Sequence, residues 1–179
     1  DYIEVGDYKD LNAAFTISAW VKNENNGTKA SIVSKRDAAY TEGYDFEIQN
    51  NNKIAMSWNG GADAITSNTK IPNGEWHHIA VIFNNGTATL YIDGVLDQTA
   101  FNLNTPNDTA QSFIIAAAGA SNTTDFFKGN LDEIRIWNVA LTESQLRYMM
   151  NQEIADDAGS VNGTELPNTI ASNDASSLQ

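Results

Sequence analysis

The stretch from residue 74 to residue 94 constrains the fold most, because it reads as two β-strands joined by a tight turn. Large apolar side chains occupy every second position from Ile79 to Phe83, and the alternation resumes at Leu90 and Ile92. Between these runs, Asn85-Gly86 supplies the positive φ angles that a two-residue hairpin turn requires. A hairpin with one apolar face needs a second layer to cover it, so we expect an antiparallel β-sandwich.

The rest of the chain repeats this pattern of short strands separated by turns rich in Asn and Gly. We expect the further strands at residues 2–5, 15–22, 31–36, 44–49, 53–58, 64–68, 95–101, 112–118 and 127–138. One short helix is expected after Thr142, because Thr142 and Gln145 have the spacing of a capping box. Residues 1–153 therefore form the domain, and the polar residues 154–179 form a C-terminal extension or linker.

Three segments resemble laminin-G-like, concanavalin A-like jelly-roll domains. Residues 76–81 (Trp-His-His-Ile-Ala-Val) followed by 90–94 (Leu-Tyr-Ile-Asp-Gly) are similar to the central signature of that family. Residues 15–22 resemble its early core strand, and residues 127–141 resemble its last long strand. The resemblance implies a two-sheet antiparallel jelly roll with one short C-terminal helix. It also implies that the chain, which starts inside a strand, is an excised piece of a larger protein.

Charge and composition exclude several classes of partner. The 179 residues carry a formal net charge of −13, from 23 acidic and 10 basic side chains. This balance argues against binding nucleic acid or anionic membranes, because both depend on lysine and arginine contacts to phosphate. No apolar run is long enough for membrane insertion, and the chain has no cysteine. The acidic balance is compatible with calcium, which prefers carboxylate and carbonyl oxygens.

The carboxylates do not form the pattern of a glycosidase. Glucanases of the resembled fold carry Glu-x-Asp-x-x-Glu on one strand, whereas this chain has Asp45 and Glu47 on one strand face without a third acid. We expect these two side chains on a solvated face. Asp132 and Glu133 are adjacent, so they point to opposite faces and cannot act as a catalytic pair. We therefore expect that the domain is not an enzyme.

The two histidines are also expected to be structural. His77 and His78 are neighbours on a strand, so their side chains point to opposite faces. Such a pair is poorly placed to provide two ligands to one zinc ion.

The resemblance implies two places for calcium, the one cofactor that we expect. Asp132 lies in the last strand, where related modules often use an acid to hold a structural ion. Pentraxins share this sandwich, and the matching loops of this chain carry Asp37, Asp125 and Asn122. The alternative for each carboxylate is a structural one, in which it accepts hydrogen bonds from loop amides.

A sugar site needs an aromatic ring beside planar polar groups. Trp58 ends a strand and runs into a polar turn that contains Asn59 and Asp63, while Tyr40 and Tyr44 flank another loop. These five residues are the predicted ligand contacts. The alternative for Trp58 is that its ring packs in the core at the edge of the sheet.

The resemblance favours a non-catalytic, lectin-like carbohydrate-binding module of a larger secreted or cell-surface protein. Its partner would be a glycan or polysaccharide. The alternative is a protein-adhesion or spacer module that binds a cell-surface protein or nothing. A glycan module predicts an exposed Trp58, whereas a spacer predicts that Trp58 is buried.

Overall fold

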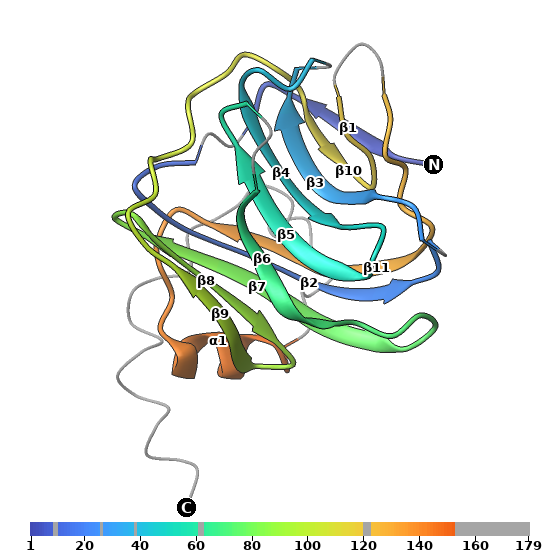
Figure 1. Cartoon of the computed structure of the whole chain (residues 1–179), viewed down its shortest axis with the longest axis vertical. Coiled ribbons are helices and arrows are strands. Elements are labelled where there is room, and N and C mark those ends of the chain that lie inside the picture. The colour runs from blue at the N-terminus through green and yellow to red at the C-terminus, as the bar shows by residue number, and fades with distance from the viewer. Residues whose placement is uncertain (9–10, 26, 38, 61–62, 120–122, 153–179) are drawn as a thin grey trace, which may run out of the picture. The chain divides into compact units, whose positions relative to one another are not determined.

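The computed structural model describes residues 1–8, 11–25, 27–37, 39–60, 63–119 and 123–152. The chain divides into two compact units, Asp1–Ala140 and Leu141–Gln179. The first unit is a sandwich of two antiparallel sheets (Figure 1), which confirms the predicted jelly-roll fold. No helix within the described ranges is long and apolar enough to cross a membrane.

The first sheet has six strands in the order β1-β10-β3-β4-β5-β6. In chain order these strands are β1 (Ile3–Gly6), β3 (Ala30–Arg36), β4 (Gly43–Ile48), β5 (Lys53–Trp58), β6 (Asp63–Lys70) and β10 (Phe113–Ile115). β3 contains a bulge between Ser31 and Val33, which shifts its register against β4 by one residue. The bulge places Ser31, Ser34 and Arg36 on the same side of the sheet as Asp45.

The second sheet has five strands in the order β11-β2-β7-β8-β9. They are β2 (Ala14–Asn23), β7 (Trp76–Asn84), β8 (Thr87–Ile92), β9 (Val95–Ala100) and β11 (Gly129–Trp137). The predicted hairpin is β7–β8, and its turn has φ angles of 45° at Asn85 and 89° at Gly86. Both residues of the turn therefore adopt the positive φ that the Asn-Gly pair predicts.

The core lies between the two sheets and is built from the alternating residues of their inner faces. Phe15 of β2 stacks on Phe83 of β7 with ring centroids 5.2 Å apart. From the other sheet, Phe46 of β4 and Met56 of β5 are fully buried in the same cluster. The alternating apolar positions of each strand therefore face the core, and burial of their side chains stabilises the sandwich.

Side-chain hydrogen bonds centred on Asp97 join one edge of the sandwich. Asp97 of β9 accepts hydrogen bonds from the backbone N–H groups of Asn68 at 2.6 Å and Thr69 at 3.0 Å, both in β6. The edge strands of the two sheets are connected in this way without backbone pairing. The Asp97 carboxylate thus accepts hydrogen bonds from N–H groups that would be unpaired at an open sheet edge.

The second unit contains α1 (Glu143–Met149), the predicted helix. Its capping box is complete, because Thr142 accepts from the N–H of Gln145 and the Gln145 side chain accepts from the N–H of Thr142. The predicted extension begins at residue 154, which lies outside the described residues.

Candidate functional site

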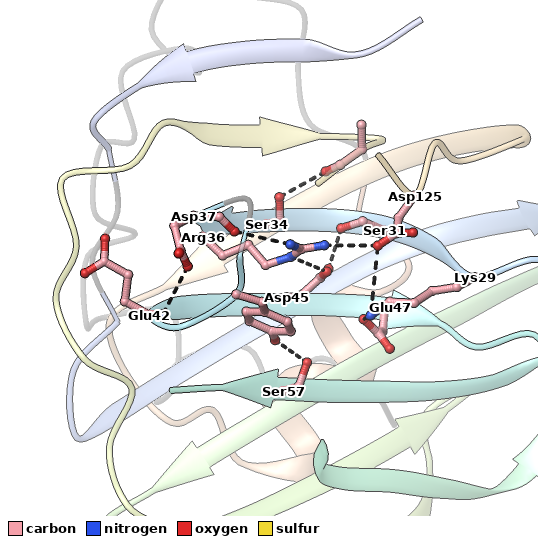
Figure 2. Close-up of polar contacts among 12 residues, drawn as sticks. Lys29, Ser31, Ser34, Arg36, Asp37, Glu42, Asp45, Glu47, Ser57 and Asp125 are labelled. Atoms are coloured by element: carbon pink, nitrogen blue, oxygen red, sulfur yellow. Dashed lines mark hydrogen bonds and ion pairs between the residues drawn. The ribbon is translucent and has the colours of Figure 1, made fainter. Parts of the chain in front are cut away.

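The outer face of the six-stranded sheet, on the side away from the core, carries a cluster of charged and hydroxyl side chains. We call it the outer-face cluster and define it as Lys29, Ser31, Arg36, Tyr40, Asp45, Glu47, Ser57 and Asp125 (Figure 2). Asp45 and Glu47 were expected on a solvated face, but they are only 0% and 2% exposed. That expectation is wrong, because long side chains from β3 and from neighbouring loops lie across them.

Arg36 lies at the centre of the cluster, between two carboxylates (Figure 2). Its Nε donates to Oδ2 of Asp45 at 3.0 Å, and its Nη2 donates to Oδ2 of Asp125 at 3.0 Å. Its Nη1 donates to the backbone oxygen of Asp37 at 3.3 Å. The guanidinium therefore links the sheet to two loops that are far apart in the sequence.

Asp45 accepts hydrogen bonds on both oxygens. Ser31 Oγ donates to Oδ1 at 2.5 Å, while Arg36 donates to Oδ2. Burial raises the pKa of Asp45 above its usual value, and the charge of Arg36 and the Ser31 hydrogen bond act against that rise. Because both of its neighbours donate, the ionised carboxylate is the form that fits this arrangement.

A second ion pair lies beside the first. Lys29 Nζ is 2.6 Å from Oε2 of Glu47 and 4.0 Å from Oδ2 of Asp125. Partial burial lowers the pKa of Lys29, but the hydrogen bond and the charge of Glu47 outweigh burial and the pKa is raised. The side chains of Lys29 and Asp125 remain 37% and 26% exposed, so solutes can reach these parts of the cluster.

Tyr40 supplies an aromatic ring at the same place. Its hydroxyl is hydrogen-bonded to Ser57 Oγ, and its ring centroid is 4.4 Å from Cζ of Arg36 and 5.7 Å from Nζ of Lys29. The backbone of Tyr40 has a φ of 55°, which is unusual for a bulky residue. Such strain persists only where the surroundings fix the conformation, and it is common at ligand sites.

The loop at 37–42 that carries Tyr40 is built around Asp37. Oδ1 of Asp37 accepts from the backbone N–H groups of Thr41 at 2.7 Å and Glu42 at 3.1 Å, and Oδ2 accepts from Oγ1 of Thr41 at 2.9 Å. Slight desolvation raises the pKa of Asp37, but these hydrogen bonds outweigh it and the pKa is lowered. Asp37 therefore has the structural role of capping loop amides.

Two of the predicted sugar contacts are buried in the core, and burial of Trp58 is the result that the spacer alternative predicts. Trp58 is 6% exposed and Tyr44 is 1% exposed. The Trp58 ring packs edge-on against Phe15 at 6.4 Å and Phe83 at 5.4 Å, and its Nε1 donates to the backbone oxygen of Asn104 at 2.8 Å. Tyr44 and Trp58 are register partners in β4 and β5, so both point to the inner face.

The other predicted contacts separate into different places. Asn59 holds the connection that follows β9, because its Nδ2 donates to Thr105 O at 2.8 Å and its Oδ1 accepts from Asn107 N at 2.6 Å. Asp63 begins β6 in register with Ser57, and its side chain lies outside the described part of the structure. Of the predicted contacts whose side chains the structure describes, Tyr40 is the one that joins the outer-face cluster.

The predicted calcium ligands do not assemble a calcium site in the described residues. Arg36 donates to Oδ2 of Asp125 and to the backbone oxygen of Asp37, whereas the Asp37 carboxylate accepts from Thr41 and Glu42. Asp132 is exposed on β11 and accepts from the backbone N–H of Glu133 at 2.8 Å, and Asn122 lies outside the described residues. Within the described ranges, no three His, Cys, Asp or Glu side chains are grouped to hold a metal ion.

The histidines have structural contacts. Nδ1 of His77 is 2.8 Å from Oδ2 of Asp93, which also accepts the backbone N–H of His78 on Oδ1. The ring of His78 is buried and packs edge-on against Trp20 at 5.5 Å. The two rings thus point to opposite sides of the sheet and contact different residues.

Sequence reasoning missed Arg36, Lys29 and Ser57 as members of the site. A signal for Ser57 was present, since it has the opposite parity to Met56 and therefore points to the outer face. Arg36 could not be assigned in this way, because the bulge in β3 changes the parity of every residue after it.

Comparison with known proteins assigns the chain to a family. A family model described as the concanavalin A-like lectin/glucanases superfamily matches residues 1–147. Mouse usherin is 26% identical over 146 residues, which is 76% of this chain but 3% of usherin. The chain therefore spans a small fraction of the length of that relative.

Two solved structures show similar folds. Domain 4 of AbnA, a GH43 extracellular arabinanase from Geobacillus stearothermophilus solved with arabinotriose, has a TM-score of 0.69 and 27% identity. That match covers 83% of this chain and 71% of the AbnA chain. The CBM40 of the Ruminococcus gnavus IT-sialidase bound to α2,3 sialyllactose has a TM-score of 0.68, 12% identity and coverage of 77% and 83%. At 12% identity, the match to CBM40 shows similarity of fold alone.

Proposed function

Because this chain belongs to the concanavalin A-like lectin/glucanases superfamily, we propose that it is a carbohydrate-binding module that holds a glycan over Tyr40. The sugar would lie at the outer-face cluster, on the six-stranded sheet. Arabinotriose in domain 4 of AbnA supports a carbohydrate ligand, since that domain shares both fold and 27% of its sequence with this chain.

The observation that carries the proposal is the conformation of Tyr40. The backbone of Tyr40 has a φ of 55°. Its half-buried ring is held in place by a hydroxyl contact to Ser57 and by stacking on Arg36. Sugar rings offer an apolar face and a rim of hydroxyls, so they suit an aromatic ring flanked by planar charged groups. Hydroxyl partners are available in Lys29, whose Nζ is 5.7 Å from the ring centroid, and in Asp125, which bonds the same Arg36 that stacks on the ring.

A role in binding without cleavage agrees with the burial and ion pairing of Asp45 and Glu47. Asp45 is paired with Arg36 and Glu47 with Lys29, and both acids are buried. A glycosidase acid must reach the glycosidic oxygen and give up a proton to it. Neither of these carboxylates has the freedom to do so.

We further propose that the chain acts outside the cell, as part of a larger secreted or surface protein. The support is the extracellular arabinanase whose domain 4 it resembles, together with the short fraction of usherin that it matches.

Protein adhesion is a second candidate, and one surface favours it. Tyr2, Ile3 and Val5 at the edge strand β1 are 44%, 60% and 49% exposed, and Phe126 beside Tyr2 is 45% exposed with ring centroids 6.0 Å apart. Exposed apolar patches of this kind mark contacts with other proteins. The two candidates use different residues, so they can be tested separately.

The test is a broad glycan array probed with wild type, Tyr40→Ala and Tyr2→Ala, with and without a calcium chelator. We expect binding in the micromolar to millimolar range that Tyr40→Ala loses and Tyr2→Ala retains, with no effect of the chelator because Arg36 already neutralises Asp125. Loss only in Tyr2→Ala would overturn the site at Tyr40 and place the glycan at the edge strand β1, and absence of binding by folded wild type would favour protein adhesion. Loss on chelation would favour a calcium site at Asp37 and Asp125.

A further inference from the structure

The charges around Tyr40 bear on which glycans could bind there. The outer-face cluster and the described residues of the 37–42 loop carry two cations, Lys29 and Arg36, against five carboxylates. These carboxylates are Asp37, Glu42, Asp45, Glu47 and Asp125. The site is therefore acidic, in a chain whose net charge is already −13.

Both cations are already paired with carboxylates. Arg36 directs Nε and Nη2 to Asp45 and Asp125 at 3.0 Å each. Lys29 lies 2.6 Å from Glu47. An acidic sugar could reach Arg36 only by breaking a buried ion pair, which leaves a carboxylate without its partner, and at Lys29 it would meet a charge that Glu47 already balances.

The accessible groups are instead suited to hydroxyls. Asp125 is 26% exposed at its side chain, and a carboxylate accepts hydrogen bonds from the hydroxyl groups of a sugar. Tyr40 adds a half-buried aromatic ring, which suits the apolar face of a neutral sugar. The same carboxylates would repel a uronate or sialate at short range.

We propose that this site selects neutral glycans and rejects anionic ones, including uronic-acid and sialic-acid oligosaccharides. The inference rests on the proposed function, because it concerns the ligand of the same site. It separates this chain from the structurally similar CBM40, which was solved with sialyllactose.

The experiment compares matched neutral and acidic ligands by calorimetric titration of the whole chain at 20 mM and 300 mM NaCl. The pairs are galactotriose with trigalacturonate and lactose with 3′-sialyllactose, and arabinotriose is the additional neutral probe. We expect at least one neutral ligand to bind, its acidic partner to bind at least tenfold more weakly at 20 mM NaCl, and that gap to narrow at 300 mM NaCl.

Two variants show whether the site itself sets the preference. Asp125→Asn removes one charge beside Tyr40, and Glu75→Gln removes one charge from a residue whose side chain is 71% exposed before β7. We expect Asp125→Asn to reduce the neutral-to-acidic ratio at least threefold at 20 mM NaCl, and Glu75→Gln to leave it unchanged. Equal effects of the two variants would assign the preference to net charge and overturn the proposal.

The outcomes separate the two proposals. Equal or stronger binding of the acidic partner that Tyr40→Ala abolishes would overturn the selectivity but leave the carbohydrate site standing. Absence of binding to every neutral and acidic probe by folded wild type would overturn both.

Discussion

Nε of Arg36 donates to Oδ2 of Asp45 over 3.0 Å, on the outer face of a sheet whose other face forms the core. Both side chains are buried, although strand alternation alone would place them in water. Ser31 donates a further hydrogen bond to the Asp45 carboxylate, and Asp125 accepts one from the Arg36 guanidinium. A buried ion pair of this kind fixes geometry, and here it fixes the base on which Tyr40 lies.

Arg36→Met should destabilise the protein strongly, because it leaves the carboxylate of Asp45 buried without its cation. We expect a loss of about 3–5 kcal/mol in the free energy of unfolding, measured by urea denaturation. The double variant Arg36→Met with Asp45→Leu should recover most of that loss, since no buried charge remains. A loss below about 1 kcal/mol in the single variant would mean that Asp45 is solvated or protonated.

Gly43 should tolerate no side chain. A Cβ at Gly43 would lie 1.9 Å from the backbone oxygen of Lys35, where β4 pairs with β3. Gly6 is the matched control, because its φ of 82° is close to the 80° of Gly43 and nothing lies within 4 Å of its Cβ position. We expect Gly6→Ala to cost roughly 1–2 kcal/mol from φ alone, and Gly43→Ala to cost several kcal/mol more or prevent folding. Equal costs would contradict the pairing of β3 with β4.

Trp58 should behave as a core residue. We expect Trp58→Ala to cost about 3–5 kcal/mol in urea denaturation, because a large buried ring is removed. Trp58→Phe should cost less, since it retains the contacts with Phe15 and Phe83. Glycan affinity per folded molecule should stay the same in Trp58→Phe. A selective loss of affinity there would return Trp58 to the binding site.

The stability of the domain should fall in mild acid because of His78. Burial and, to a smaller extent, the charge of Arg135 lower the pKa of His78 from 6.5 to about 4, against an opposing effect of Asp93. Between these values the unfolded chain binds a proton that the folded chain does not, so stability decreases as the pH falls. We expect a loss of about 2 kcal/mol between pH 7 and pH 5.

His78→Phe is the control for that prediction, because it keeps an aromatic contact with Trp20 and has no titrating group. The dependence of unfolding free energy on pH from 7 to 5 should become flatter by about the same 2 kcal/mol. An unchanged slope in the variant would show that another group titrates in this range.

The strands and the hairpin could be predicted because their signals are local. The positions from Ile79 to Phe83 alternate, and Asn85-Gly86 specifies the turn without reference to any other part of the chain. The inward position of Trp58 was also present in the sequence, because it shares its parity with Ile54 and Met56.

The outer-face cluster could not be predicted in the same way. Its members come from β3, β4, β5 and a loop near residue 125, and their meeting depends on strand order and register. The bulge after Ser31 changes the face of Arg36, and no local residue pattern marks that bulge. The burial of Asp45 and Glu47 depends on their pairing with Arg36 and Lys29 in this arrangement. Strand alternation alone does not reveal that pairing, so it predicted a solvated face.

The most direct test of the account is an amide NMR titration of the isotope-labelled chain with arabinotriose, or with the neutral glycan that the array selects. We predict that the largest shift changes fall on Tyr40, Thr41, Ser57 and Asp125, and that they disappear in Tyr40→Ala while its other resonances keep their positions. Shift changes confined to β1 near Tyr2, or to the five-stranded sheet, would contradict a glycan site on the outer face of the six-stranded sheet.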